Sequence, residues 1–272
     1  MAQWECVPVC AGPSEMTPGG GRTVNRHLGR STWTEVADGL LLVVPLGATE
    51  QHGPHLPVDT DTTVATELAT RLVAGRSDAV LAPPLPYGAS GEHQDFPGTL
   101  SLGAPALESV LVELVRSADR FKGTVLVSGH GGNAAPLQRA FVRLAAEGRK
   151  VMSWSPSPTV LGGATPELTA RLSGDHHAGL VETSIMLALS PESVRVTQVA
   201  PGRVVAPLAE LMPRLLRDGV SGVSADGVLG DPTGASAELG HRWLAALAAD
   251  LARRVGEWAI TAAQTTPEGL AR

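Results

Sequence analysis

Three side chains of metal-binding type follow one apolar run near the start of the chain. Residues 47–61 read GATEQHGPHLPVDTD and contain Glu50, His52 and Asp61. In an extended segment the side chains of Glu50 and His52 point the same way, because they are two positions apart. Asp61 falls at the start of a helical pattern, where the helix dipole favours an ionised carboxylate. A solvated loop with capping residues is the alternative, but polar groups this dense directly after a buried run favour a binding site.

Two further stretches add a histidine and a carboxylate. Residues 128–133 read SGHGGN, and the three glycines around His130 predict an imidazole exposed to a ligand, with Asn133 capping the next helix. Residues 174–184 read GDHHAGLVETS. Glu182 lies there among apolar residues, where a carboxylate is costly unless a cation or hydrogen bonds compensate it. The alternative is that Glu182 points outward to water. His177 lies at the entrance of the same helix.

The combined set predicts a binuclear metal centre. Mixed imidazole and carboxylate ligands suit Zn²⁺, Mn²⁺ or Fe²⁺. A single ion seldom needs five side-chain ligands, whereas two ions about 3.5–4 Å apart that share a carboxylate use them naturally. Such a pair makes hydroxide available and polarises a carbonyl, which favours hydrolysis of an amide bond. The departing amine then needs a proton, and His177 is the candidate general acid and base.

The elements that must position these residues alternate between buried strands and amphipathic helices. We expect strands at 40–46, 79–85, 124–128 and 150–154, with helices at 61–74, 107–118, 178–189 and 235–260 and another through 137–144. This alternation predicts one α/β domain of three layers around a mostly parallel sheet. Ligands gather at the carboxyl ends of such strands, which selects the loops 47–61, 87–99 and 129–133. We expect the domain to span 28–262, between tails at 1–27 and 263–272.

Composition excludes several classes of partner. Hydrophobic residues make up 43% of the chain and the net charge is -6, so neither a nucleic-acid groove nor an anionic membrane surface is expected. The two cysteines, Cys6 and Cys10, rule out a disulfide framework. No apolar run reaches the roughly 18 residues of a membrane span, and the amino terminus lacks a signal-peptide pattern. We therefore expect a cytoplasmic protein.

The same motifs, with FPGTLS at 96–101, resemble the creatininase family of binuclear amidohydrolases from about residue 32 to 258. The resemblance implies an α/β fold around a parallel sheet, a homo-oligomer that is often a hexamer, and two divalent ions per subunit, with zinc, iron and manganese as candidates. It also implies the role of each site residue by position: one ion is held by Glu50 and His130, the other by His52 and Glu182, Asp61 bridges them, and His177 is the catalytic histidine.

One departure from the family pattern affects the choice of substrate. Creatininase itself has a tyrosine and a catalytic glutamate directly after the histidine that matches His130, and this chain has Gly131 and Gly132 there. The two glycines disfavour creatinine as a substrate. They also predict a more open cavity, able to admit a larger molecule.

Two other segments are similar to the mycofactocin-pathway branch of this family, namely YGASGEHQDFPGTLSLG at 87–103 and SADGVLGDPTGAS at 224–236. Members of that branch are peptidases that trim a modified precursor peptide. The resemblance implies removal of the C-terminal Val–Tyr unit of the crosslinked precursor, with Glu92 and His93 lining the substrate cavity; a polar surface turn is the alternative for this pair. Two other functions stay open: hydrolysis of a small cyclic amide or formamide, and a non-catalytic metal-binding or assembly protein.

Overall fold

A computed structural model describes residues 26–162, 165–202 and 205–264. Its centre is a parallel sheet of four strands in the order β2-β1-β3-β4. The strands are β1 (Leu41–Leu46), β2 (Ala79–Leu81), β3 (Gly123–Ser128) and β4 (Val151–Trp154). Strand β1 pairs with β3 over its full length, with Leu41 opposite Gly123 and Leu46 opposite Ser128. The carboxyl ends of these two central strands therefore lie side by side.

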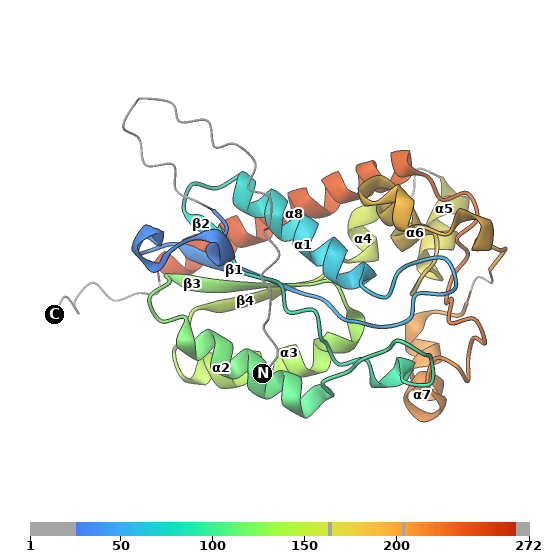
Figure 1. Ribbon diagram of the computed structural model, residues 1–272, viewed down its shortest axis with the longest axis horizontal. Helices are drawn as coiled ribbons and strands as arrows, with labels where there is room; N and C mark the ends of the chain where they lie inside the picture. The colour runs from blue at the N-terminus through green and yellow to red at the C-terminus, as the bar shows by residue number, and fades with distance from the viewer. Residues whose placement is uncertain (1–25, 163–164, 203–204, 265–272) are drawn as a thin grey trace, which may run out of the picture.

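Helices cover both faces of the sheet (Figure 1), which confirms the three-layer α/β expectation. One face packs against α1 (Thr60–Ala74), α6 (Leu180–Leu189) and α8 (Ala237–Gln264), and the other against α2 (Ala104–Ser117) and α3 (Ala134–Ala146). Successive side chains of β1 alternate between these cores: Leu41 and Val43 belong to the first, and Leu42 and Val44 to the second. Burial on both faces explains why the strand is a continuous apolar run.

Three further helices, α4 (Pro158–Leu161), α5 (Pro166–Ser173) and α7 (Leu208–Asp218), lie toward the end of the sheet where β1 and β3 finish (Figure 1). The short 3-10 turns are η1 (Leu28–Arg30), η2 (Trp33–Glu35), η3 (Gly91–His93), η4 (Gly131–Asn133), η5 (Pro191–Ser193) and η6 (Val196–Gln198). Of these, η1 and η2 precede β1 and lie at the opposite end of the sheet, in blue at the left of Figure 1. The sequence patterns did not predict α5 or α7. Helix α7 contains Pro213, which interrupts the helical pattern on which such a prediction depends.

The edge strand is shorter than expected. We predicted a strand over 79–85, but β2 ends at Leu81, because Pro83 and Pro84 have no N–H for a continued ladder. Pairing resumes only as an isolated bridge between Leu46 and Leu85. On the outer side of β2, the N–H of Leu81 donates to the carbonyl of Arg26 at 2.8 Å. Of the expected tails at 1–27 and 263–272, residues 1–25 and 265–272 lie outside the described residues.

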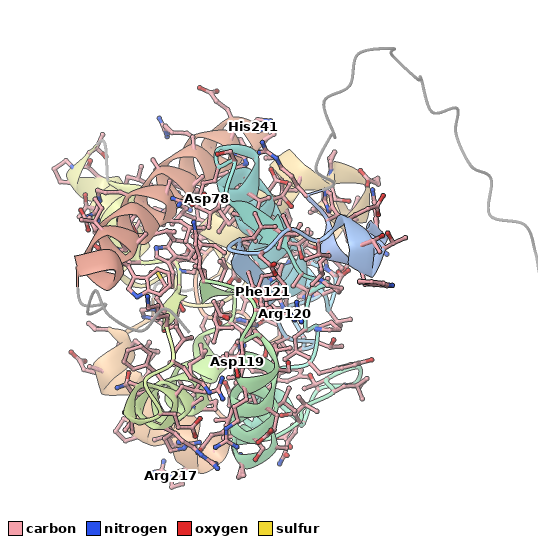
Figure 2. All side chains as sticks on the ribbon, turned by 90° about the vertical axis from the view of Figure 1, so that its left-hand side faces the viewer. Asp78, Asp119, Arg120, Phe121, Arg217 and His241 are labelled. Atoms are coloured by element: carbon pink, nitrogen blue, oxygen red, sulfur yellow. The ribbon has the colours of Figure 1, made fainter. Side chains whose placement is uncertain are left out.

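The amino-terminal edge of the sheet faces the viewer in Figure 2, which labels Asp78, Asp119 and Phe121 there. A hollow of about 470 Å³ lies at this edge, lined by residues that include Phe121, Lys122 and Arg149. Its charges are paired, because Lys122 contacts Asp78 and Arg149 contacts Asp119. None of the predicted site residues lines it, so the chemistry must be sought at the opposite edge. Within the described residues, no helix is both long and apolar enough to cross a membrane.

Candidate metal centre

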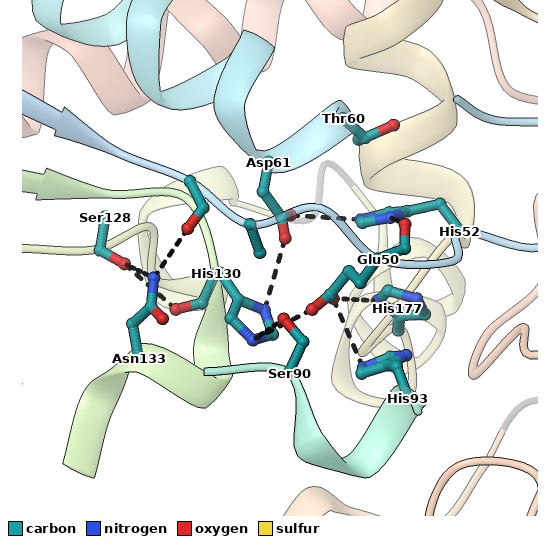
Figure 3. Close-up of polar contacts among 12 residues, drawn as sticks. Glu50, His52, Thr60, Asp61, Ser90, His93, Ser128, His130, Asn133 and His177 are labelled. Carbon is teal, nitrogen blue, oxygen red and sulfur yellow. Dashed lines mark hydrogen bonds and ion pairs between the residues drawn. The ribbon is translucent and has the colours of Figure 1, made fainter. Parts of the chain in front are cut away.

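Four of the five predicted ligands, Glu50, His52, Asp61 and His130, converge where β1 and β3 end (Figure 3). Glu50 and His52 lie on the loop after β1 and are 0% exposed, and His130 lies two residues beyond β3 and is 6% exposed. We expected the glycines to leave His130 exposed to a ligand with little steric shielding, and the structure shows more shielding than that. The loop that follows β2 covers the imidazole, with the carbonyl of Ala89 3.1 Å from Nε2 and the hydroxyl of Ser90 3.4 Å from it.

One amide side chain ties the three loops together. Asn133 accepts a hydrogen bond from the N–H of Ala89 at 2.9 Å and donates to the carbonyl of Gly47 at 3.1 Å. We expected this residue to cap α3, and the structure corrects that expectation, since its side chain makes no capping hydrogen bond to that helix. Close approach of the loops also requires Gly129, where a Cβ atom would lie 2.3 Å from the carbonyl oxygen of Asp61.

The first half of the centre surrounds His52. Its Nδ1 donates to the carbonyl of Glu50 at 3.1 Å, which turns Nε2 toward Asp61 Oδ1 at 3.2 Å and Glu182 Oε2 at 3.9 Å. Such a second hydrogen bond is how proteins orient a histidine that binds a metal. Burial by itself would lower the pKa of His52, but the Asp61 carboxylate outweighs it and raises that pKa to about 10. Without a cation, a proton occupies the space between the imidazole and the carboxylate.

The second half surrounds His130. Its Nε2 lies 3.1 Å from Glu50 Oε2, and its Nδ1 lies 3.4 Å from Asp61 Oδ2. Asp61 therefore faces both imidazoles, one with each carboxylate oxygen, as Figure 3 shows. Burial opposes the charge on His130, yet Glu50 and Asp61 raise its pKa to about 10. Burial likewise raises the pKa of Asp61, and the neighbouring His52 offsets part of that increase.

Unpaired buried oxygens test whether metal ions fit here. Within the described part of the chain, no donor makes an aligned hydrogen bond to either oxygen of Glu50 or to Oδ2 of Asp61. Burying carboxylate oxygens without donors is costly, so this arrangement calls for a cation. Donor atoms around one ion with bonds of about 2.0–2.2 Å lie about 3.0–3.5 Å apart, close to the separations around His52 and His130. The residues therefore fit divalent ions such as zinc or manganese.

Glu182 reaches the centre from the first turn of α6. Its side chain is 26% exposed, so it is less buried than the apolar helix predicted, but it points at His52 rather than only at water. Its Oε2 accepts the N–H of Ala178 at 2.6 Å. Ala178 has a φ of 52°, a left-handed conformation that is uncommon for a residue other than glycine. Such strain is typical of functional sites, and here it separates His177 from the helix that holds Glu182.

Gln51, which the sequence did not single out, sets the proton positions of a neighbouring histidine. Its Oε1 accepts the N–H of Gly53 at 2.8 Å and its Nε2 donates to the carbonyl of Gly227 at 3.1 Å, which fixes the orientation of the amide. The same Nε2 lies 2.9 Å from His93 Nδ1 and 3.1 Å from His177 Nε2; because His177 Nε2–H donates to the carbonyl of Gln51, the second hydrogen of the amide is left for His93 Nδ1. His93 must carry its own proton on Nε2, which lies 3.4 Å from Glu50 Oε1.

His177 is held in one tautomer by the same residue. Its Nε2–H donates to the backbone carbonyl of Gln51 at 2.7 Å, which leaves Nδ1 as the unprotonated nitrogen, 3.9 Å from Glu50 Oε1. Its backbone pairs with Leu229, so the segment around that residue positions the ring. Burial lowers the pKa of His177 and keeps the imidazole neutral. A neutral ring with a free Nδ1 directed at the centre can accept a proton.

Sequence reasoning placed Glu92 and His93 at the substrate cavity, and the structure places both against the centre on η3. His93 is 4% exposed and the Glu92 side chain is 30% exposed. A further carboxylate was missed: Asp175 accepts the N–H groups of Leu180 and Val181 at 2.9 and 2.8 Å and so anchors the start of α6. Burial raises the pKa of Asp175 to about 7. Its position two residues before His177 was the available signal.

Comparison with known proteins identifies the family. Residues 29–255 match the family model described as Creatininase: Creatinine amidohydrolase. The mycofactocin precursor peptide peptidase of Mycobacterium ulcerans (strain Agy99) is 46% identical over 240 residues, which cover 84% of this chain and 87% of that protein. The protein of the same name from Mycolicibacterium smegmatis (strain ATCC 700084 / mc(2)155) is 45% identical over 224 residues, covering 80% and 85%.

Solved structures agree with this relationship. A structure titled Creatininase Mn has a TM-score of 0.68 at 28% identity and covers 85% of this chain and 98% of its own. A mutant creatininase of Zn-Zn type has a TM-score of 0.66 at 28% identity and covers 85% and 97%. Manganese and zinc therefore both occur in proteins that share this fold, in line with the buried Glu, His and Asp groups described above. The chain belongs to the creatininase family of metal-dependent hydrolases.

Proposed function

We propose that this enzyme cleaves a peptide bond in a modified precursor peptide, as its mycobacterial relatives are named for doing. The specific reaction we propose is removal of the C-terminal Val–Tyr unit from the crosslinked mycofactocin precursor. The observation that supports it most directly is the identity of 46% over 240 residues with a mycofactocin precursor peptide peptidase. The centre described above supplies the chemistry that such a cleavage needs.

The ligands divide between two ions that share one carboxylate. Glu50 and His130 would hold one ion, His52 and Glu182 would hold the other, and Asp61, which lies between the two histidines, would be shared by both ions. When bound, two divalent ions supply a hydroxide nucleophile near neutral pH and polarise the scissile carbonyl. The protein excludes water from these charges, because Glu50 and His52 are 0% exposed, and electrostatic interactions are therefore stronger there than in solvent.

His177 moves the proton. Because Nε2–H is held by the carbonyl of Gln51, Nδ1 is the atom that accepts a proton during attack and returns it to the departing amine. Nδ1 lies 3.9 Å from Glu50 Oε1 and so faces the residues that would hold the ions. Burial keeps the ring neutral before reaction, which is the form that a general base requires.

Room for a peptide comes from the loop after His130. A Cβ atom on Gly131 would meet no other atom within 4 Å, so the space around this residue is open, whereas the space at Gly132 is filled by Glu92 and Ala89. This opening favours an extended substrate over a compact cyclic amide.

Mass spectrometry tests the proposal. The crosslinked precursor is incubated with the metal-loaded protein, the metal-stripped protein and the His177→Ala variant, and creatinine is assayed beside it. We expect loss of the Val–Tyr mass only with the metal-loaded wild type and no turnover of creatinine. Intact precursor together with turnover of creatinine would overturn the peptidase assignment. Turnover of neither substrate would favour a non-catalytic binding protein.

We also propose that the enzyme is a cytoplasmic homo-oligomer, with a hexamer as the specific expectation. Exposed apolar side chains such as Trp33, at 87%, and Leu100, at 55%, are suited to cover by another copy. Light scattering after size exclusion would measure the mass, and a monomer at micromolar concentration would contradict the assembly. Fractionation of the native cells tests the compartment.

A further inference from the structure

Glu92 lies beside the half of the centre that surrounds His130. Its carbonyl accepts the N–H of Val220 at 2.8 Å, which fixes the backbone of η3 against the end of α7. Its side chain then extends toward the centre, with Oε1 3.7 Å from His130 Nε2. The carboxylate therefore shares this imidazole nitrogen with Glu50, whose Oε2 lies 3.1 Å from it.

Gly132 leaves the space that Glu92 fills. A Cβ atom at position 132 would lie 2.4 Å from His130 Nε2, 2.5 Å from Glu92 Oε1 and 2.4 Å from the carbonyl oxygen of Ala89. Real Cβ atoms do not approach other atoms this closely, so this backbone admits no side chain at position 132. The chain therefore brings a carboxylate to His130 from η3, across the gap that the glycine leaves.

The two halves of the centre then have the same construction. Around His52 Nε2, the oxygens of Asp61 and Glu182 lie at 3.2 and 3.9 Å. Around His130 Nε2, the oxygens of Glu50 and Glu92 lie at 3.1 and 3.7 Å. In each half the nearer oxygen lies within the spacing of about 3.0–3.5 Å expected around a single ion, and the farther oxygen lies just beyond it. Glu50 is buried and its oxygens receive no aligned hydrogen bond within the described residues, which independently calls for a cation at this point.

We propose that Glu92 is a metal ligand, which together with Glu50 and His130 completes the coordination of the ion on that side. The inference rests on the proposed binuclear centre and changes the expectation that Glu92 only lines the substrate cavity. His93, its neighbour, lies beside the other oxygen of Glu50, with Nε2 3.4 Å from Oε1 and no aligned hydrogen bond between them.

Manganese binding to the full chain tests the inference without any substrate. Stripped wild type, Glu92→Gln, Glu92→Ala and Asp95→Asn are titrated with Mn²⁺, and bound metal is measured by elemental analysis and by electron paramagnetic resonance. Asp95 is the matched control, because it lies in the same loop, is exposed and binds Ser221 rather than the centre. We expect two ions and a spin-coupled spectrum for wild type and Asp95→Asn.

The Glu92 variants should keep one ion and show an uncoupled six-line spectrum. Their affinity for the second ion should fall about tenfold or more, because even residues that only hydrogen-bond to metal ligands change metal affinity by about tenfold. Retention of the first ion shows that each variant is folded. Two ions bound with wild-type affinity in both Glu92 variants would overturn the inference while leaving the binuclear centre intact. A wild type that binds fewer than two ions would overturn the binuclear centre, and the role of Glu92 with it.

Discussion

Metal loading should release protons, because imidazolium protons occupy the metal-free centre. The pKa values of His52 and His130 are both raised to about 10, as Asp61 and Glu50 outweigh the effect of burial. A solution at pH 8 is about two pH units below each of these pKa values, so removing the proton from one Nε2 costs roughly 3 kcal/mol. Binding two ions at pH 8 should therefore release close to two protons, and the affinity for each ion should rise about tenfold per pH unit from pH 7 to 9.

Titration calorimetry measures this release. Mn²⁺ is added to stripped protein at pH 8 in buffers of different ionisation enthalpy, and the dependence of the observed heat on that enthalpy gives the number of protons. His130→Ala is the comparison and should release about one proton with one ion. A value near zero for wild type would refute the reasoning, because it would mean that both rings are neutral before metal arrives.

The same shifts set the sign of the pH dependence of stability. The raised pKa values mean that both rings stabilise the metal-free fold fully below the ordinary histidine value of 6.5, and that this contribution is lost as the pH rises through about 10. The metal-free protein should therefore lose stability between pH 7 and 10, which thermal melting would show. The metal-loaded protein should not follow this decline.

Three substitutions test other parts of the structure. His177→Ala should lower kcat by about 10²–10⁴-fold while both ions stay bound, and loss of metal would contradict a role limited to proton transfer. Gly179→Ala should lower the melting temperature and weaken metal binding, because a Cβ there would lie 1.5 Å from Asp175 Oδ1. The control is Gly256→Ala on α8, where a Cβ meets nothing within 4 Å; this substitution should stabilise the fold by about 0.5–1 kcal/mol. Equal effects of the two glycine substitutions would refute the account of Asp175. Leu247 is 1% exposed, so Leu247→Ala should lower the free energy of unfolding by about 2–5 kcal/mol in a denaturant titration. Leu216 is 79% exposed, so Leu216→Ala should leave that free energy nearly unchanged. A small loss for Leu247→Ala would place that residue outside the core.

The sequence was most informative where one kind of interaction dominates. The strands β1 and β3 were predicted within one residue, because burial on both faces leaves an unbroken apolar run. The convergence of Glu50, His52 and Asp61 followed from their spacing after such a run, and the family resemblance assigned a partner to each. Helix α1 was also found within one residue, from a stripe of buried leucines and valines on one side.

The failures concern contacts between segments far apart in the chain. Asn133 looks like a helix cap from its neighbours, yet its amide bonds to Gly47, which lies 86 positions away. Alternation along an extended segment would point Gln51 away from Glu50 and His52. Instead its side chain turns to meet Gly227, which is 176 positions away. The residues near Asn133 and Gln51 in the sequence do not indicate these distant partners. The hydrogen-bond network that sets the histidine tautomers therefore could not be predicted.

The place of α8 in the fold has a consequence for the timing of metal uptake during synthesis. Its buried leucines, Leu244, Leu247 and Leu251, lie in the same core as Ile185 and Met186 of α6, the helix that holds Glu182. We therefore expect α6 to settle beside the loops from β1 and β3 only after α8 has been synthesised. A nascent chain that lacks α8 would have no complete cage for the ion held by His52 and Glu182, so that ion should bind later than the ion held by Glu50 and His130.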